Sequence, residues 1–468
     1  MMSVNNSKQM DIYKINIEQY IPKEHLVRKL KKAIDWNKIR EIAKPYYHES
    51  KGRPSIDPVI LFKMVMINYI FGLHSMRKTE QEIIVNLAYR WFLDLEIDDK
   101  VPDYSTYSKN YERRFKGTTV FKEIFEYILN ECAKNKLLKL DSIFVDSTHI
   151  KANANKNKYE NQLINLEAKV YQEELEVEIN QTRDFYEQKS RQFNHYGEEK
   201  NRKVSTVDPE SGLFHKGEKE KCFAYTSSVI CDEKGFVIKQ NITAGNVHDS
   251  KSFHEVYNML SEKERASILN VVADSGYINP YLIRRIVKDG FVPIMPYKRP
   301  MTKKGYFKKY EYVYDEYYDE YICPNNKVLT YKTTEKNGYK KYESKAYNCE
   351  NCPFKDGCTK SATKVILRHI WEEYIELKEE IRHSAVYAEE YPKRSKTIER
   401  IFGDLKEKFN LRYTRYRGKE KVNNDLTLAF ACMNLKKMAT WLYKDVETSS
   451  ENMFLFMKTL VFLEIFDN

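Results

Sequence analysis

The chain has 468 residues, a length at which two or three domains with a large buried core are expected. Hydrophobic residues at 42% and charged residues at 31% are ordinary for a soluble protein and argue against a membrane-embedded chain. The formal net charge of +11 indicates a polyanionic partner.

The two ends of the chain give no membrane signal. The first twenty residues lack the apolar core of a secretory signal peptide. The most apolar run, residues 453–466, is too short to span a bilayer and contains Lys458 and Glu464. We therefore expect a cytoplasmic protein without membrane contact, in which residues 446–468 form a buried or dimer-forming apolar helix.

Residues 1–135 are expected to be helical. The nearly continuous apolar run at 60–71 suits a core helix, with Asp57 as its N-cap and Pro58 at the first helical position. A second helix is expected at 77–94. Short helices with exposed arginines fit both a DNA-binding domain and a plain helical bundle, and the sequence by itself slightly favours the plain bundle.

Two buried strands are each followed by an aspartate. Residues 143–145 are apolar on both faces, as in a central strand of a covered sheet, and Asp146 ends this run. Residues 268–273 form a second such strand before Asp274, and the helix and strand that follow imply parallel pairing. Sites in open α/β sheets lie at the carboxyl ends of strands, so the two aspartates together predict a functional site. Taken singly, Asp146 is also explained as the cap of a turn through the hydroxyl residues after it.

Residues 222–243 predict a β-hairpin that turns at 233–235. The loop after this hairpin contains Asn246, His248 and Asp249. Helix capping by Asn246 and Asp249 is favoured there over a metal or catalytic role for His248.

Two segments interrupt the predicted sheet. Residues 152–204 are polar, with a long helical section at 159–193, and are interpreted as an insertion or a solvated helical hairpin. Residues 300–364 are rich in Tyr and Lys and contain four cysteines, Cys323, Cys349, Cys352 and Cys358. Four thiolates with one close pair suit a tetrahedral structural zinc ion, and a small insert with few apolar residues needs such a staple. Four reduced thiols packed in the insert are the alternative.

A helix near residue 399 carries a carboxylate, an aromatic ring and an ammonium on one side. Glu399, Phe402 and Lys406 follow each other at i, i+3 and i+7. The next segment, 412–421, alternates Arg with Tyr and offers rings for stacking on bases and three cations for phosphates: Arg412, Arg415 and Arg417. Residues 422–443 are expected to close the domain as an amphipathic helix.

Three acids on different elements, with no thiolate or histidine beside them in sequence, favour Mg²⁺ or Mn²⁺ over zinc. Two such ions roughly 4 Å apart hold the attacking and leaving oxygens of a phosphodiester. In this arrangement Asp146 bridges the ions, Asp274 and Glu399 complete one each, and Lys406 holds a phosphate near the cut.

With these motifs the chain resembles a known family, the DDE transposases of bacterial insertion sequences, whose catalytic domain is RNase H-like. The resemblance covers most of the chain and rests on GRPSIDPVILFKMVMINYIFG, PDYSTYSKNYERRF, FVDSTHIKA, TAGNVHDS, VVADSGY and IERIFGDLK…RYRG. It implies an α/β fold: an RNase H-like mixed sheet flanked by helices, an N-terminal all-helical domain and a small Cys-rich insertion. It also implies Asp146, Asp274 and Glu399 as the metal-binding catalytic triad and Lys406 as a DNA contact.

The resemblance divides the chain into a helical DNA-binding domain at 1–135, the first part of the catalytic domain at 136–299, the Cys-rich insertion at 300–364, the final catalytic part at 365–445, and the C-terminal helix at 446–468. The expected partner is double-stranded DNA, at transposon ends and at the target, which makes the protein nucleoid-associated when bound. Joining two DNA ends calls for two active sites, so we expect a homodimer in the active complex.

The chain departs from the family at one point. The family often has a Tyr and an Arg ahead of the Glu, with three residues between Arg and Glu. Ser395 occupies that Arg position here, and Tyr391 and Arg394 are each displaced by one residue. Either the start of the helix absorbs the shift and Arg394 keeps the DNA contact, or Lys396 takes it over.

The expected activity is terminal-repeat binding followed by two-metal phosphodiester cleavage and strand transfer. One alternative is a metal-dependent nuclease on the same fold that does not transfer strands. The other is a catalytically inactive DNA-binding protein derived from a transposon. The presence of all three acids and Lys406 argues against inactivation.

Overall fold

The computed structural model describes residues 16–48, 55–165, 171–193, 199–216, 220–299 and 302–466. The chain forms two compact units. The first, which we call the helical unit, contains the described residues up to 138, residues 401–416 and residues 420–466. The second, the sheet unit, contains residues 139–400 and 417–419.

The helical unit contains one strongly apolar helix, α3 (Pro58–Ile70), most of whose side chains are buried. As predicted, Pro58 is its first residue and the Asp57 carboxylate caps it, accepting a hydrogen bond from the Val59 N–H at 2.8 Å. The other elements before residue 138 are η1 (Ile17–Tyr20), α1 (Leu26–Ala33), α2 (Trp36–Ala43), η2 (Lys44–Tyr46), α4 (Met76–Val85), α5 (Leu87–Phe92), α6 (Ser105–Asn110), the π turn η3 (Tyr111–Phe115) and α7 (Val120–Lys134).

The single helix predicted at 77–94 is two helices. α4 ends at Val85, and α5 begins at Leu87. Between them the Asn86 side chain accepts hydrogen bonds from the N–H groups of Ala88 and Tyr89. An asparagine that caps a new helix in this way competes with continuation of the old one.

The C-terminal helix α16 (Lys419–Phe466) is continuous. The separate helix predicted at 446–468 is therefore wrong within the described residues, since no Gly or Pro interrupts the sequence from 419 to 466; residues 467 and 468 lie outside them. From residue 420, α16 groups with the helical unit and not with the catalytic domain, where residues up to 445 were predicted. The contacts explain this, because Lys436 donates to the Ile70 carbonyl of α3 at 2.9 Å. None of the helices in the described ranges has the length and apolar character needed to cross a membrane.

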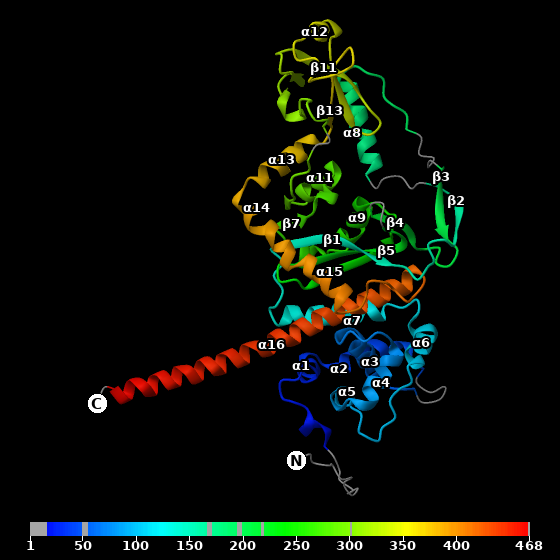
Figure 1. The fold of residues 1–468 in the computed structure, drawn as a ribbon, viewed down its shortest axis with the longest axis vertical. Helices are drawn as coiled ribbons and strands as arrows, with labels where there is room; N and C mark the ends of the chain where they lie inside the picture. Colours follow the sequence, from blue (N-terminus) through cyan, green and yellow to red (C-terminus); the bar gives the residue numbers. More distant parts are fainter. Residues whose placement is uncertain are drawn as a thin grey trace, which may run out of the picture. The chain divides into compact units, whose positions relative to one another are not determined.

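The sheet unit is organised around a mixed sheet (Figure 1) with the strand order β4-β5-β1-β7-β8, in which β6 also pairs with β5. Its strands are β1 (Ser142–Lys151), β4 (Gly212–Lys216), β5 (Glu220–Asp232), β6 (Val237–Ala244), β7 (Asn270–Ala273) and β8 (Val292–Ile294). β1 runs antiparallel to β5 and parallel to β7, and β7 runs parallel to β8. The predicted hairpin is the β5–β6 pair.

The central strands of this sheet are buried on both faces. Ile143, Phe144 and Val145 of β1 are each 0% exposed. Helices pack on the sheet, among them α9 (Asp249–Tyr257), α11 (Pro280–Lys288) and α13 (Glu372–Arg382), whose apolar side chains join the same core. A mixed sheet flanked by helices, together with the N-terminal helices, confirms the predicted fold class.

β1 does not end at Asp146, contrary to the prediction. Its pairing with β7 stops at Val145↔Ala273, whereas its pairing with β5 continues to Lys151↔Ala224. β1 therefore extends past the end of its parallel partner because its antiparallel partner is longer. Asp274, by contrast, directly follows the last residue of β7, as predicted.

The helical section predicted at 159–193 is only partly helical. β2 (Tyr159–Asn165) pairs antiparallel with β3 (Glu199–Ser205) in a separate two-stranded sheet, and only α8 (Gln172–Phe185) is a helix. The prediction failed at 159–165 because the strand's partner lies more than thirty residues away and leaves no local signal.

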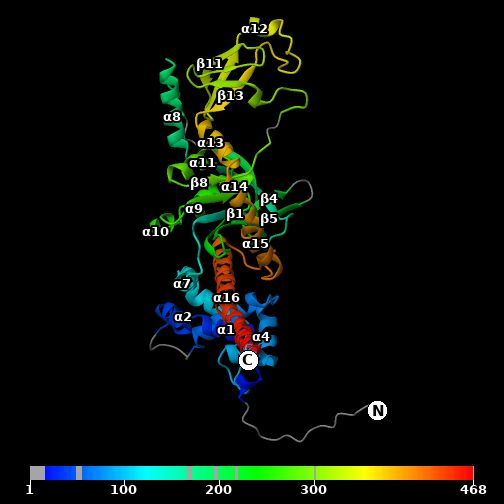
Figure 2. The same cartoon turned by 90° about the vertical axis from the view of Figure 1, so that its left-hand side faces the viewer.

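The Cys-bearing segment folds into an antiparallel sheet of its own, in the order β13-β12-β11-β10-β9. Figure 2 shows this sheet as a layer apart from the mixed sheet, with α8 beside it. Its elements are η5 (Lys309–Glu311), β9 (Val313–Asp315), β10 (Glu320–Ile322), β11 (Val328–Thr334), β12 (Tyr339–Ser344), α12 (Ala346–Glu350) and β13 (Val365–His369). Its small core is mostly aromatic and includes Tyr312, Tyr321 and Tyr342.

The remaining elements of the sheet unit lie near the candidate site or between strands. They are α10 (Glu262–Arg265), η4 (Ser275–Tyr277), α14 (Ala385–Glu390) and η6 (Tyr391–Lys396). The boundary between the units falls inside α15 (Ile398–Glu407), after Arg400.

Candidate active site

Asp146 and Asp274 lie side by side on neighbouring strands. They are the residues immediately after the last parallel pair, Val145↔Ala273, and neighbouring strands are roughly 4.8 Å apart. Each carboxylate uses one oxygen locally: Asp146 Oδ1 accepts from the Ser147 N–H, and Asp274 Oδ1 accepts from the Gly276 N–H, both at 2.8 Å. The turn-capping interpretation and the site interpretation are therefore compatible, because capping occupies only one oxygen of each carboxylate.

Glu399 brings a third carboxylate from the first turn of α15. Burial is the largest cause that raises the pKa of Asp146 to about 6, and the negative charges of Asp274 and Glu399 raise it further. The Arg394 guanidinium and the Ser147 N–H act in the opposite direction. The three predicted acids are thus close enough for their charges to act on one another.

Arg394 is the cation of this site. Its Nη2 lies 2.6 Å from Asp146 Oδ2, and the two side chains are only 6% and 18% exposed. The Nε of Arg394 is buried and has no hydrogen-bond partner among the described residues. The guanidinium also lies 5.8 Å from the centre of the Tyr391 ring, which stacks on Tyr387.

The displacement of Tyr391 and Arg394 by one residue is absorbed before α15. η6 ends at Lys396, and Thr397 then adopts φ −109° and ψ −96°, outside helical geometry. Of the two candidates for the family's Arg position, Arg394 is buried at the site, whereas Lys396 is exposed. The neighbouring Lys393 fixes η6 by ion pairs with Glu233 at 3.0 Å and Glu390 at 2.7 Å.

One residue that the sequence analysis missed connects the two aspartate-bearing strands. Tyr277, 2% exposed, donates from its hydroxyl to Ser147 Oγ at 2.9 Å. The tyrosine belongs to the VVADSGY motif, so its proximity to Asp274 was visible in the sequence, but its partner was not. His248 caps α9 by accepting from the Ser250 N–H, so the capping role assigned to Asn246 and Asp249 is performed by the histidine.

The donor set fits magnesium or manganese in its chemistry, since it consists of carboxylate oxygens, from the half-buried Asp146 and Asp274 and from the exposed Glu399. In the part of the chain that the structure describes, however, no three His, Cys, Asp or Glu side chains converge closely enough to hold one ion. At Asp146 the second carboxylate oxygen accepts a hydrogen bond from Arg394.

The lysine and arginine side chains predicted to contact DNA differ in burial and in their partners within the protein. Lys406 is half-buried on α15, seven residues after Glu399 on the same helix, roughly 10 Å along its axis. Arg412 makes an exposed ion pair with Glu407. Arg417 donates from Nε to the Asn153 carbonyl at 3.2 Å, within the sheet unit.

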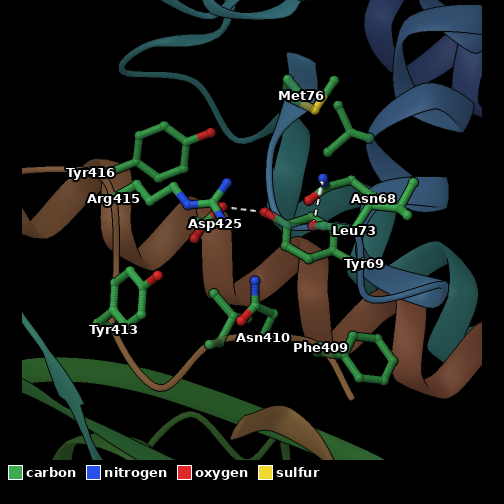
Figure 3. Close-up of a pocket in the computed structure, with 12 residues that line it drawn as sticks. Asn68, Tyr69, Leu73, Met76, Phe409, Asn410, Tyr413, Arg415, Tyr416 and Asp425 are labelled. Carbon is green, nitrogen blue, oxygen red and sulfur yellow. Dashed lines mark hydrogen bonds between the residues drawn. The ribbon is translucent and has the colours of Figure 1, made fainter. Parts of the chain in front are cut away.

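Arg415 lines a small cavity of about 50 Å³ in the helical unit (Figure 3), formed by α3, residues 409–416 and α16. In it the Asp425 carboxylate accepts a hydrogen bond from the Tyr69 hydroxyl. Burial raises the pKa of Asp425 to about 6, against the effects of Tyr69 and Arg415. Arg415 therefore faces an internal carboxylate, which is a structural role and not the predicted DNA contact.

The four cysteines of the small sheet are free thiols. Cys358 Sγ lies 3.0 Å from the Tyr312 hydroxyl, and Cys323 Sγ accepts from the Lys327 N–H at 3.4 Å. Burial raises the pKa of Tyr312, and the nearby Cys358 and Cys323 raise it further. Cys352 contacts Asn325 at 3.5 Å, and Cys349 contacts Ser344 at 3.0 Å. The thiols lie in one region of the small sheet without forming a group of three ready to bind an ion.

Comparison with known proteins gives two matches to family models. A model described as "Transposase domain (DUF772)" matches residues 15–113, and one described as "Transposase DDE domain" matches residues 322–439. The second match contains Glu399 and Lys406, whereas Asp146 and Asp274 lie between the two matches. Neither a curated protein nor a solved structure shows significant similarity to the chain.

Proposed function

The chain belongs to the DDE transposases of insertion-sequence type, and we propose that Asp146, Asp274 and Glu399 are its metal-binding catalytic triad. The observation that supports this most strongly is the register of β1 and β7, which puts two carboxylates side by side on neighbouring strands. The effect of Glu399 on the pKa of Asp146 supports the third member.

The chemistry of the proposed reaction is metal-assisted phosphoryl transfer. Mg²⁺ or Mn²⁺ held by the three carboxylates would lower the pKa of an attacking hydroxyl and stabilise the departing oxyanion. The chain itself brings three carboxylates close enough for their charges to interact, and Arg394 pairs with Asp146 when no metal ion is bound. Once released, the Arg394 guanidinium is suited to a DNA phosphate, and Lys406 offers a second cation further along α15.

The proposed substrates are the terminal repeats of the element and a target DNA. In the first step water attacks the phosphorus at the element end, the bond to the 3′ oxygen breaks, and a free 3′-hydroxyl remains. In the second step this hydroxyl attacks a target phosphodiester, so one bond forms and one breaks. We further propose a homodimer as the active form, since joining two ends calls for two such sites.

A cleavage and joining assay on DNA carrying the element's ends, with Mg²⁺ or EDTA, tests the proposal. Asp146→Asn, Asp274→Asn and Glu399→Gln are expected to abolish both reactions and leave DNA binding intact. Asp141→Asn is the matched control, because Asp141 is an exposed aspartate just before the amino end of β1. Unchanged cleavage by the three variants would refute the triad.

The same assay separates the alternative functions. Metal-dependent cutting without joining by the wild type supports the nuclease. DNA binding without any metal-dependent reaction supports the inactive DNA-binding protein. Size-exclusion chromatography with light scattering on the DNA complex tests the dimer, and one chain per complex would contradict it.

A further inference from the structure

The β2–β3 pair is an exposed ribbon that belongs to no larger sheet. Figure 1 shows it standing apart from the mixed sheet, and its seven residue pairs make a ribbon roughly 24 Å long. The segment that leads into it, residues 155–162, is exposed throughout. An isolated two-stranded ribbon is at most marginally stable in water, so a ribbon of this kind gains stability from a partner.

The base of this ribbon is fixed next to the catalytic strand. β1 ends at Lys151, only eight residues before β2 begins, and the Thr206 N–H donates to the Lys158 carbonyl at 3.2 Å. The buried Asp208 then accepts from the Tyr225 hydroxyl of β5 at 2.8 Å and from the Gly418 N–H at 3.1 Å. The ribbon is therefore held to the sheet that carries Asp146 and to the segment that contains Arg417.

The charge of the ribbon favours a polyanion. Residues 151–165 and 199–205 contain six Lys or Arg and two Glu. Protein–protein interfaces are depleted of charged residues at their centre and enriched in aromatic ones, so a second protein chain is a poor match. A duplex is a good match, because the major groove is about 12 Å wide and admits a two-stranded ribbon.

The register gives each face of the ribbon an amide side chain opposite a cation. Gln162 pairs with Arg202 on one face, and Asn161 pairs with Lys203 on the other. Lys203 is engaged within its face, since its ammonium donates to the Tyr159 hydroxyl at 2.8 Å and lies 4.1 Å from the ring centre. The backbones of Gln162 and Arg202 pair within the ribbon, whereas their side chains make no hydrogen bond or ion pair with the described residues. Glutamine pairs with adenine and arginine with guanine in the major groove through two hydrogen bonds each.

We propose that the β2–β3 ribbon enters the major groove of double-stranded DNA at the transposon end, with Gln162 and Arg202 facing base edges and Lys203 close to the phosphates. The inference rests on the proposed function for the identity of the DNA. It adds a sequence-reading element to the catalytic unit, distinct from the helical unit.

Binding of the full-length chain to two duplexes tests the proposal: one carries the terminal inverted repeat, and the other has the same base composition in scrambled order. Gln162→Ala and Arg202→Ala are each expected to reduce the preference for the repeat about tenfold, in line with the loss of one two-bond base contact. Lys203→Ala is expected to weaken binding to both duplexes equally and to lower the salt slope by about one.

The double variant Lys263→Ala, Lys288→Ala is the control, because both lysines are exposed on helices α10 and α11, outside the ribbon. Thermal unfolding of each variant checks that the fold is kept. A photoreactive residue at position 162 gives an independent readout, with cross-linking to the repeat DNA as the expected result. Cross-linking to a second copy of the chain, or an unchanged preference in both base-contact variants, would overturn the proposal.

These outcomes are distinguishable from failure of the proposed function. If the wild type cuts and joins the element's ends while the ribbon variants keep full preference, only the ribbon proposal fails. If the wild type binds the repeat through the ribbon but shows no metal-dependent chemistry, only the catalytic proposal fails.

Discussion

Arg394→Ala, which removes a guanidinium group, is the substitution whose effect the structure predicts most clearly. Arg394 and Asp146 form a nearly buried ion pair, 6% and 18% exposed, with 2.6 Å between Nη2 and Oδ2. Removing one partner of a buried pair leaves the other charge uncompensated, at a cost of about 3–5 kcal/mol. Arg394→Ala is therefore expected to lower the free energy of unfolding of the ion-free sheet unit by that amount.

Arg412→Ala is the matched control for this prediction. It also removes a guanidinium group, but from an ion pair with Glu407 in which the two side chains are 63% and 60% exposed. Exposed ion pairs contribute about 0–1 kcal/mol to stability, so a small effect is expected. Urea denaturation in EDTA at pH 7, followed by circular dichroism, measures both variants.

A double-mutant cycle with Asp146→Asn isolates the interaction between the two side chains. The combined variant Asp146→Asn, Arg394→Ala is expected to be more stable than the sum of the single effects predicts, since it removes both charges together. Saturating Mg²⁺ is expected to reduce the cost of Arg394→Ala, because a cation then compensates Asp146. If Arg394→Ala costs no more than Arg412→Ala, or if the cycle gives no coupling, the role assigned to Arg394 is wrong.

Three further predictions follow from the same structure. The pKa of Asp146 is about 6 in the folded chain against 3.8 for a free aspartate, so protonation of this carboxyl favours the folded state. The free energy of unfolding in EDTA should therefore fall by roughly 3 kcal/mol as the pH rises from about 4 to 6. Urea unfolding across this pH range measures the fall, which should be absent in Asp146→Asn. If the four cysteines bind zinc, elemental analysis should find one zinc ion per purified wild-type chain and none in Cys352→Ser. A wild-type chain without zinc would instead support four reduced thiols. Lys406→Ala should weaken binding to the element's ends and lower the salt slope by about one. Lys408→Ala, which removes the same charge two residues further along the chain, is the matched control and should change both less. Equal effects of the two variants would count against Lys406 as a DNA contact.

Local features of the chain were predictable because their signals are contiguous. The Asp57–Pro58 helix start, the β5–β6 hairpin and the strand before Asp274 all appear where the residues indicate them. In each case the apolar run and its cap or turn lie within a dozen residues, and the deciding hydrogen bonds are local.

Features that depend on a distant partner were not predictable. The sequence predicts helix where β2 forms, because the strand's partner, β3, is remote in sequence. β1 runs past Asp146 because β5 is longer than β7, and α16 groups with the helical unit through contacts with α3. Each outcome depends on which surface the segment meets after folding, and the segment's own residues do not contain that information.

The candidate site likewise combines features that are visible in the sequence with features that depend on distant contacts. The amino-acid sequence establishes which groups are present: three carboxylates on separate elements, a lysine two turns after the third, and cations around them. The folded chain shows in addition that β1 and β7 pair in parallel with Asp146 and Asp274 in neighbouring positions, and that Arg394 and not Lys396 pairs with Asp146. The physical reason is that strand register and burial are set by the packing of segments more than a hundred residues apart. This packing fixes the distances between charged groups, whereas the linear sequence shows only which charged groups exist.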